Sequence, residues 1–299
     1  MSDEARRAPK FPLRLDQMAA ARKTLVKAPQ GTGGAVPVKP LKSSAPAPMT
    51  PRTILRPQQP LQHAASVSAR RTAPTGLGLD SAGVRQRMAD RLRVEGLRNE
   101  TVLSAMAAVP RHQFVDAALV TQSYEDTSLP IGHGQTISKP SVVARMIELL
   151  MDGANAKGRS AGAGQLGRVL EIGTGCGYQA AVLAQLGKQV FSVERLKPLH
   201  DKARELMAPL RLSNVRLVYG DGMLGHAPNA PYDAIIAAAG GDALPAAWMD
   251  QLAVGGRIVA PVREGDKQVL VVVDRDEQGF KRSVHEVVQF VPLRSGTVR

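Results

Sequence analysis

The stretch Val169-Leu-Glu-Ile-Gly-Thr-Gly-Cys-Gly-Tyr178 decides how the second half of the chain is expected to fold. A short apolar run leads directly into three glycines, and residues 178–186 then have the composition of a helix. A strand, a glycine turn and a helix in this order form the first half of a nucleotide-binding βαβ unit. The glycines allow a tight turn and let a ligand approach the backbone where a Cβ atom would collide.

A second apolar run, residues 189–193, ends in Glu194, which lies 21 residues after Gly173. In βαβ units of this kind, a carboxylate at that distance accepts hydrogen bonds from ribose hydroxyls. We therefore expect an adenosine-containing cofactor, although an ordinary βα turn with a surface glutamate is the alternative. The residues expected to bind this cofactor are Glu171, Gly173, Thr174, Gly175, Gly177, Glu194, Asp221 and Gly222.

The spacing of the glycines indicates which cofactor is bound. Dinucleotide sites use GxGxxG, whereas this chain has GxGxG and carries Tyr178 where the third glycine would fall. Glu171 at the end of the strand would repel a pyrophosphate but suits an ammonium or sulfonium group, and S-adenosylmethionine has both. A third strand, 215–219, delivers Asp221, whose carboxylate can accept a hydrogen bond from an adenine amino group. These features favour S-adenosylmethionine over NAD, and a plain turn role is the alternative for Asp221.

Apolar strands alternate with helical segments from residue 169 onward, at 169–172, 190–193, 215–219 and 232–237. Such alternation predicts a parallel sheet covered by helices on both faces. The last strands, expected at 257–262, 268–273 and 283–290, are joined by loops too short for crossover helices and should pair antiparallel. The predicted class is α/β: a Rossmann-like methyltransferase fold with a mainly parallel sheet and antiparallel C-terminal strands, preceded by small helices and a disordered tail.

The charge of the chain is concentrated in its first quarter. Residues 1–79 contain 13 Lys and Arg against Asp3, Glu4 and Asp16, and they hold 11 of the 21 prolines. A segment of this composition cannot bury enough apolar surface to offset its ordering entropy. We therefore expect a basic, Pro/Ala-rich disordered extension over 1–79 and a methyltransferase domain over 80–299. Within that domain, 80–165 should form the helical and substrate-loop part and 166–299 the cofactor-binding sheet.

The basic extension could attract nucleic acid or an anionic membrane weakly, through non-specific electrostatics. It contains no aromatic residue beyond Phe11 and no zinc-ligand spacing, so we expect no specific nucleic-acid module and no membrane partner. No secretion signal is recognisable, but an acid-poor, arginine-containing leader is also typical of an organellar transit segment. Cys176 is the single cysteine, which excludes an intramolecular disulfide and a thiolate metal cluster. The expectation is a cytoplasmic, monomeric protein without a metal.

The most unusual segment is Leu129-Pro-Ile-Gly-His-Gly-Gln-Thr-Ile-Ser138, which is followed by Lys139-Pro140 and a helical run. Thr136, Ser138 and Lys139 are therefore expected at a helix N-terminus, where backbone amides favour an anion. A capping loop with Ser138 as a structural cap is the alternative. A Ser-His-Asp hydrolase is excluded by the absence of a GxSxG elbow.

The run 129–140, with its Gly-Gln-Thr-Ile-Ser string, resembles the substrate-site signature of protein-L-isoaspartate (D-aspartate) O-methyltransferases. The resemblance extends to Ala108–Val115, Leu170–Gln179, Tyr232–Ile236 and Phe290–Leu293, and it covers essentially residues 84–296. One departure is Ala237-Ala-Ala-Gly-Gly241, where many members have Thr-Ala-Ala-Pro-Pro.

This resemblance implies methyl transfer from S-adenosylmethionine to the α-carboxylate of isoaspartyl residues in damaged proteins and peptides. The ester then collapses to a succinimide, whose hydrolysis returns part of the product to aspartate. It also implies that Ser138 is the active-site residue. We expect Thr136, Ile137 and His133 to bind the substrate, and a plain loop role is the alternative for His133, which lies between two glycines. We expect Ser138 and Thr136 to hydrogen-bond the carboxylate while helix-start amides after Lys139 offset its charge. The alternatives are a methyltransferase for a small molecule or RNA, and a nucleic-acid-associated protein acting through the basic extension.

Overall fold

The structure, a computed structural model, describes residues 82–299 of the chain. The predicted disordered extension 1–79 and its boundary with the methyltransferase domain lie outside the described residues. No helix within the described residues is both long enough and apolar enough to cross a membrane.

Helices and a short hairpin precede the central sheet. Asn99 caps helix α4 (Glu100–Ala108), because its Oδ1 accepts hydrogen bonds from the amides of Thr101 and Val102 at 3.1 and 3.2 Å. The segment expected as a loop at 129–137 instead forms an antiparallel hairpin, β1–β2. The elements of this part are α3 (Ala82–Val94), α4 (Glu100–Ala108), η2 (Arg111–Phe114), η3 (Ala117–Gln122), β1 (Leu129–Gly132), β2 (Gln135–Ile137), α5 (Pro140–Met151) and α6 (Ala154–Lys157).

The central sheet has seven strands in the order β5-β4-β3-β6-β7-β8-β9. The pairings from β5 across to β7 are parallel, and those of β7 with β8 and β8 with β9 are antiparallel. The predicted mixed sheet is therefore confirmed. Its strands are β3 (Arg168–Ile172), β4 (Gln189–Glu194), β5 (Val215–Tyr219), β6 (Tyr232–Ala237), β7 (Leu252–Glu264), β8 (Lys267–Asp276) and β9 (Gly279–Val288).

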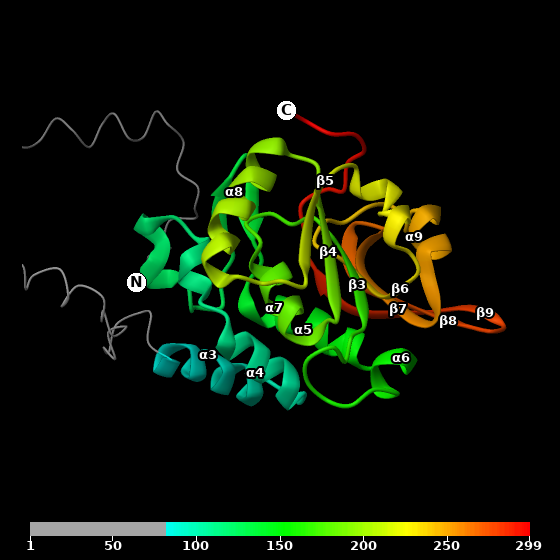
Figure 1. Ribbon diagram of the computed structural model, residues 1–299, viewed down its shortest axis with the longest axis horizontal. Coiled ribbons are helices and arrows are strands. Elements are labelled where there is room, and N and C mark those ends of the chain that lie inside the picture. The colour runs from blue at the N-terminus through cyan, green and yellow to red at the C-terminus, as the bar shows by residue number, and fades with distance from the viewer. Residues whose placement is uncertain (1–81) are drawn as a thin grey trace, which may run out of the picture. The chain divides into compact units, whose positions relative to one another are not determined.

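Both faces of the sheet are buried, which explains why its parallel strands read as continuous apolar runs. Val169 and Leu170 are fully buried neighbours that point into opposite apolar clusters. Helices α3, α4, α5 and α7 cover one face and α9 packs on the other (Figure 1). The connecting elements are α7 (Tyr178–Leu186), α8 (Lys197–Met207), η4 (Ala208–Leu210), η5 (Gly222–Leu224), η6 (Ala227–Asn229) and α9 (Ala246–Gln251).

The strand order reverses between β3 and β6. The chain runs outward from β3 through β4 to β5 and then returns to the other side of β3 as β6. The connections on the two sides of this point diverge, which leaves a crevice beyond the carboxyl ends of β3 and β6. The glycine stretch that follows β3 opens directly into this crevice.

Candidate active site

The loop between β3 and α7 can be built only with glycine at its turning points. Gly173, Gly175 and Gly177 have φ angles of 89°, 57° and 93°, in the left-handed region that residues with a Cβ rarely adopt. At Gly177, the residue before α7, a Cβ atom would also lie 2.6 Å from the sulfur of Met207. The left-handed backbone conformation and the close contact with Met207 therefore both favour glycine at position 177.

Glu194 ends β4 beside this loop and is almost fully buried. Its Oε2 accepts a hydrogen bond from the Gly175 amide, and its Oε1 accepts one from the Leu196 amide, both at 2.9 Å. These two bonds fix the carboxylate in the wall of a cavity. Each oxygen keeps a further lone pair, so the group can still accept hydrogen bonds from ribose hydroxyls.

Glu171 lies beneath the glycine loop and is completely buried. The Ser192 hydroxyl donates to its Oε2, while its Oε1 and the nearby Gln179 Nε2 have no hydrogen-bond partner within the described residues. Burial raises the pKa of this carboxyl group to about 8, although Ser192 and Gln179 act in the opposite direction. An unpaired buried acid of this kind fits a cationic ligand group. Glu171 does not itself line the cavity wall, whereas Thr174 and Gln179 do.

The cavity beyond the strand ends has a volume of about 450 Å³. The glycine loop and Glu194 form one side of it, and Leu196, Leu199 and Gly222 extend its wall. The β1–β2 hairpin and residues 291–294 complete the lining. This volume lies within the range of about 300–1,000 Å³ that is typical of ligand and cofactor sites. The residues present therefore fit an adenosine-containing cofactor.

Asp221 is placed differently from the sequence expectation. Its Oδ1 accepts from the Met223 amide at 2.9 Å, and its Oδ2 accepts from the Gly296 amide at 2.6 Å. Its side chain is not in the cavity wall, whereas the neighbouring Gly222 is. The carboxylate thus anchors the end of the chain, and its contact with adenine stays a prediction.

The chain's last residues lie over the carboxyl ends of the strands. The Gly240 amide donates to the Val291 carbonyl at 2.9 Å, and the Leu293 amide donates to the Gly240 carbonyl at 2.8 Å. Further along, Val298 bridges to Leu196. We call residues 290–298 the C-terminal strap. Sequence reasoning did not place it in the site, because its contacts are with residues about 50 to 100 positions earlier.

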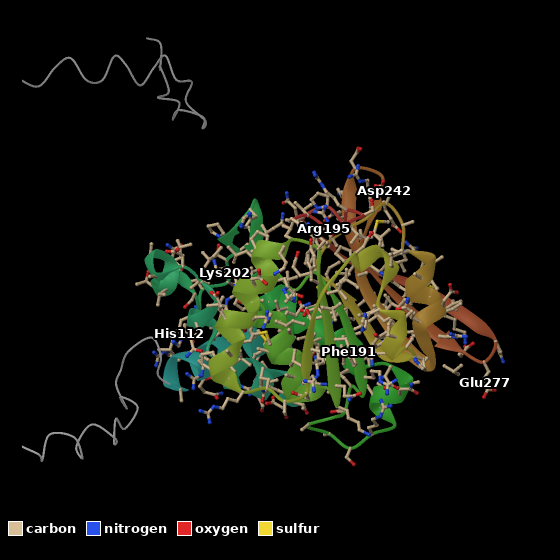
Figure 2. All side chains as sticks on the ribbon, turned by 45° about the horizontal axis from the view of Figure 1, so that its top comes forward. His112, Phe191, Arg195, Lys202, Asp242 and Glu277 are labelled. Atoms are coloured by element: carbon tan, nitrogen blue, oxygen red, sulfur yellow. The ribbon has the colours of Figure 1, made fainter. Side chains whose placement is uncertain are left out.

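The hairpin brings together the residues predicted to bind the substrate. His133 lies at its exposed turn with a φ of 53°, Ile137 is buried, and both line the cavity together with Thr136. Lys202 of α8 (Figure 2) donates from Nζ to the Ile131 carbonyl at 3.2 Å. This bond connects α8, which follows β4, to the hairpin on the opposite side of the cavity.

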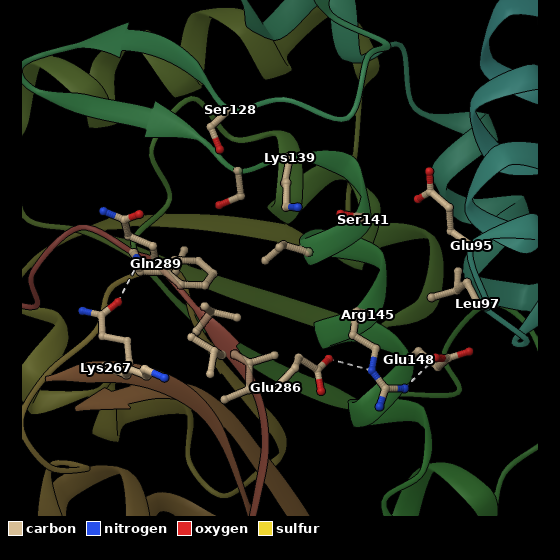
Figure 3. Close-up of a pocket in the computed structure, with 18 of the residues that line it drawn as sticks. Glu95, Leu97, Ser128, Lys139, Ser141, Arg145, Glu148, Lys267, Glu286 and Gln289 are labelled. Atoms are coloured by element: carbon tan, nitrogen blue, oxygen red, sulfur yellow. Dashed lines mark hydrogen bonds and ion pairs between the residues drawn. The ribbon is translucent and has the colours of Figure 1, made fainter. Parts of the chain in front are cut away.

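A second, larger depression of about 2080 Å³ meets the first one at Ser138. Thr136 and Ser138 line both spaces, and the Ser138 hydroxyl has no hydrogen-bond partner within residues 82–299. Figure 3 shows this groove, in which Arg145 of α5 forms ion pairs with Glu148 and with Glu286 of β9. Ser138 therefore sits at the passage between a cofactor-sized cavity and a long open groove.

The start of α5 differs from the expectation in two ways. Lys139 rather than Ser138 precedes the helix, with no side-chain cap, so the capping role considered for Ser138 is wrong. The helix-start amides are also already bonded: Asp126 accepts from the Ser141 amide and hydroxyl, both at 2.8 Å, and the next two amides donate to the Lys139 carbonyl. Although burial opposes it, Ser141 and Lys139 lower the pKa of Asp126. These amides cannot offset a substrate charge as predicted.

No cluster of three or more His, Cys, Asp or Glu side chains suited to a metal ion occurs in the described part of the chain. Cys176 is buried in the cavity wall, and burial raises the pKa of its thiol to about 11. The site therefore offers no thiolate at neutral pH.

Comparison with known proteins agrees with this geometry. Residues 84–298 match the model of the family described as Protein-L-isoaspartate(D-aspartate) O-methyltransferase. A protein-L-isoaspartate O-methyltransferase of Methylibium petroleiphilum is 58% identical over 300 residues, covering 99% of this chain and 100% of the relative. A protein-L-isoaspartate O-methyltransferase of Leptothrix cholodnii is 62% identical over 245 residues, which cover 81% of this chain and 84% of the relative.

Two solved structures share the fold. A protein-L-isoaspartate O-methyltransferase structure has a TM-score of 0.60 at 27% identity, covering 70% of this chain, which spans 65% of that structure's length. The second structure, from Plasmodium falciparum, is described as a putative enzyme of the same kind in complex with S-adenosyl-L-homocysteine. It has a TM-score of 0.60 at 23% identity, and the match covers 70% of this chain and 98% of that structure's chain. With residues 84–298 matched, this chain belongs to the protein-L-isoaspartate (D-aspartate) O-methyltransferase family.

Proposed function

We infer that this protein is an S-adenosylmethionine-dependent carboxyl methyltransferase that acts on the α-carboxylate of isoaspartyl residues in damaged proteins and peptides. Family membership supports the reaction. The single structural observation that supports it best is the position of Ser138, which lines both the cavity and the groove and whose hydroxyl has no partner in the part of the chain that the structure describes. A methyl donor in the cavity and an acceptor in the groove would meet at this residue.

The chemistry needs little from the protein beyond alignment. S-adenosylmethionine supplies a methyl group already activated by its sulfonium. A carboxylate is ionised at pH 7, so no general base has to remove a proton from it. The protein must hold the carboxylate in line with the methyl group and keep water away from both. Ser138 and Thr136 would donate hydrogen bonds that orient the carboxylate.

The cofactor roles follow from the contacts of the cavity wall. Glu194, fixed by two backbone amides, would bind the ribose, and the 173–177 loop would hold the methionine portion. Glu171 would balance the ammonium group from behind Thr174 and Gln179. Gly222 would lie against the adenine, while Asp221 would act by holding the strap rather than by direct contact. The strap itself would cover the bound cofactor.

The groove suits a protein segment better than a small molecule. It runs from the α3–α4 connection past α5 to the end of β9, and its volume is several times that of the cavity. Its charged lining has both signs, with Arg98, Lys139, Arg145, Arg263 and Lys267 beside Glu95, Glu148, Asp152, Asp266 and Glu286. Mixed charge of this kind lacks the uniformly basic character that an RNA backbone would select. A small-molecule or RNA substrate remains the alternative that the first experiment tests.

The test is methyl transfer from labelled S-adenosylmethionine to two peptides that differ only in isoaspartate versus aspartate. We expect base-labile label on the isoaspartyl peptide and none on its partner, followed by formation of succinimide and part conversion to aspartate. If both peptides stay unlabelled while the protein still binds S-adenosylhomocysteine, the isoaspartyl assignment is wrong and the groove takes another substrate. Equal labelling of both peptides would mean that the site does not distinguish the damaged residue.

We further propose that the enzyme works as a monomer in the cytoplasm. Sedimentation equilibrium of the full chain would give the molecular mass in solution, and cell fractionation would give the location. A dimer mass or a membrane-bound pool would contradict the respective proposal.

A further inference from the structure

Arg111 is fully buried beneath the active-site segment. Its Nε donates to the Ser123 carbonyl at 2.7 Å, and its Nη2 donates to the Ser138 carbonyl at 2.8 Å, with Thr127 more distant at 3.5 Å. The guanidinium carbon also lies 4.7 Å from the centre of the Tyr178 ring. One side chain of η2 thus connects the end of η3 at Ser123, the segment before the hairpin at Thr127 and the backbone of Ser138.

This buried cation has no carboxylate partner. Within the described residues Arg111 takes part in no ion pair, and its Nη1 has no hydrogen-bond partner. Burial lowers the pKa of its guanidinium. An unpaired buried charge is costly for stability, and a packing role alone could be filled by an apolar side chain of similar volume. The nearest acid in the active-site segment, Asp126, is already bonded to Ser141 and Lys139.

The orientation of the peptide group between Ser138 and Lys139 follows from the bond to Arg111. The one cis peptide bond in the described residues is Ala230–Pro231, so this group is trans. In a trans peptide the N–H and C=O bonds point in opposite directions. Because the Ser138 carbonyl points to Arg111, the Lys139 N–H points away from it. This N–H has no acceptor within the described residues, and both Ser138 and Lys139 line the groove.

We propose that Arg111 is a positioning residue that holds and polarises the Ser138–Lys139 peptide group, so that the Lys139 amide and the Ser138 hydroxyl together bind the substrate carboxylate. This inference rests on the proposed function and deepens it. A hydrogen bond to a cation draws electron density from the carbonyl, which makes the N–H on the other side of the peptide group a stronger donor. The buried positive charge lies behind this peptide group, on the carbonyl side, and its field favours an anion over a neutral group at the N–H donor.

The test measures discrimination between charged and neutral ligands. The dissociation constants of an isoaspartyl peptide and of the same peptide with an α-carboxamide are measured by calorimetry on the full chain with S-adenosylhomocysteine bound. We expect Arg111→Met to reduce the ratio of the two constants by about tenfold, the effect of one charge-assisted interaction. Affinity for S-adenosylhomocysteine should stay within about twofold of wild type, because Arg111 does not line the cavity proposed for the cofactor.

Two further variants separate positioning from general stability. Arg111→Lys keeps the cation and should keep the ratio within about threefold of wild type. Arg275 is a matched control, since its Nη1 donates to the Leu252 carbonyl at 2.6 Å and its guanidinium lies over the Phe280 ring at 5.5 Å, at the far end of β8. Arg275→Met should leave the ratio unchanged.

An unchanged ratio in Arg111→Met, with both peptides weakened equally, would overturn the proposal and reduce Arg111 to a structural role. Equal loss of discrimination in the Lys and Met variants would show that the charge is not what matters. If Arg111→Met does not fold, the Lys variant alone decides: we expect a preserved ratio, and a collapsed one contradicts the proposal. Failure of wild type to bind or methylate the isoaspartyl peptide would instead remove the proposed function, which is a different result.

Discussion

The two walls of the active site are built in opposite ways. The cofactor wall, which consists of the 173–177 loop and Glu194, comes from one continuous βαβ stretch and is bonded to itself. The substrate wall, which consists of the β1–β2 hairpin with Ser138 and Lys139, is held by distant groups: Arg111, Asp126 and Lys202. A wall formed by consecutive residues can be predicted from a sequence motif. A wall held by residues distant in the sequence can be recognised only in the three-dimensional structure. Substitutions in the two walls should therefore have different effects: those in the cofactor wall should weaken cofactor binding, and those in the substrate wall should slow methyl transfer.

The largest effect is expected where the cofactor wall depends on its backbone. Gly177→Ala should lower the free energy of unfolding by about 3 kcal/mol, from left-handed strain and a collision with Met207, and should abolish cofactor binding. Gly265 is the control, because it also has a positive φ but a Cβ there meets nothing within 4 Å. Gly265→Ala should therefore cost only about 1 kcal/mol. Equal losses in chemical denaturation would argue against the close approach of Met207.

The next largest effect is expected at the substrate wall. Ser138→Ala should reduce kcat/KM for an isoaspartyl peptide by about 10–100-fold, since one hydrogen bond to a charged group is lost, with cofactor affinity unchanged. Ser128 is a matched serine that also lines the groove but not the cavity. Ser128→Ala should keep kcat/KM within about twofold of wild type. Wild-type kinetics in the Ser138 variant would remove this residue from the reaction.

The buried acid behind the cofactor wall predicts a pH dependence. The pKa of Glu171 is about 8 in the folded chain, against the ordinary value of 4.5, so the cofactor-free folded state binds more protons than the unfolded state between these values. The stability that the protonated group contributes is therefore present below pH 4.5 and is lost as the pH rises towards 8.

Glu171→Gln removes this titration while keeping an acceptor for the Ser192 hydroxyl. Relative to wild type, the variant should gain at least about 1.4 kcal/mol of unfolding free energy between about pH 5 and pH 8, the equivalent of one pKa unit. Denaturant titrations of the cofactor-free proteins across this range provide the measurement. Parallel pH curves for the two proteins would show that Glu171 is already ionised when buried.

The smallest effect is expected where the strap meets β6. Gly240→Pro, which introduces a residue many family members have at this point, removes the amide that bonds Val291. The loss of one backbone hydrogen bond, about 1 kcal/mol, should speed cofactor release by several fold. Gly240→Ala keeps the amide and tests the contact with the Gln268 side chain separately. If both variants release the cofactor at the same rate, the strap does not depend on this bond.

The comparison of the walls also explains what the sequence could predict. The glycine loop and Glu194 were predictable because their signals lie within about 25 consecutive residues, 169–194. The position of the Asp221 side chain was not predictable, because it lies outside the cavity wall and accepts a hydrogen bond from the Gly296 amide, 75 residues further along. The prediction of free amides after Lys139 was wrong for a similar reason, because the Ser141 amide donates to the Asp126 carboxylate, which lies 15 residues earlier.

The hairpin and Arg111 were missed for physical reasons of their own. Pro130, Gly132 and Gly134 resemble a loop, and only the pairing of Leu129 with Ile137 makes the segment a hairpin. Arg111 lies in the run 108–115 that resembles the family, but a charged side chain in a sequence gives no sign that it will be buried without an anion. Of the residues expected in the site, Glu171, Gly177 and Asp221 do not line the cavity, whereas the others do.

The most direct test of the two-wall account is the rate of methyl transfer to an isoaspartyl peptide at saturating S-adenosylmethionine, measured for Glu194→Gln and Ser138→Ala side by side. Excess cofactor should restore Glu194→Gln to within about threefold of the wild-type rate, because only binding is weakened. Ser138→Ala should stay at least about tenfold slower at any cofactor concentration. Recovery of both variants, or of neither, would contradict the division of labour between the cofactor wall and the substrate wall.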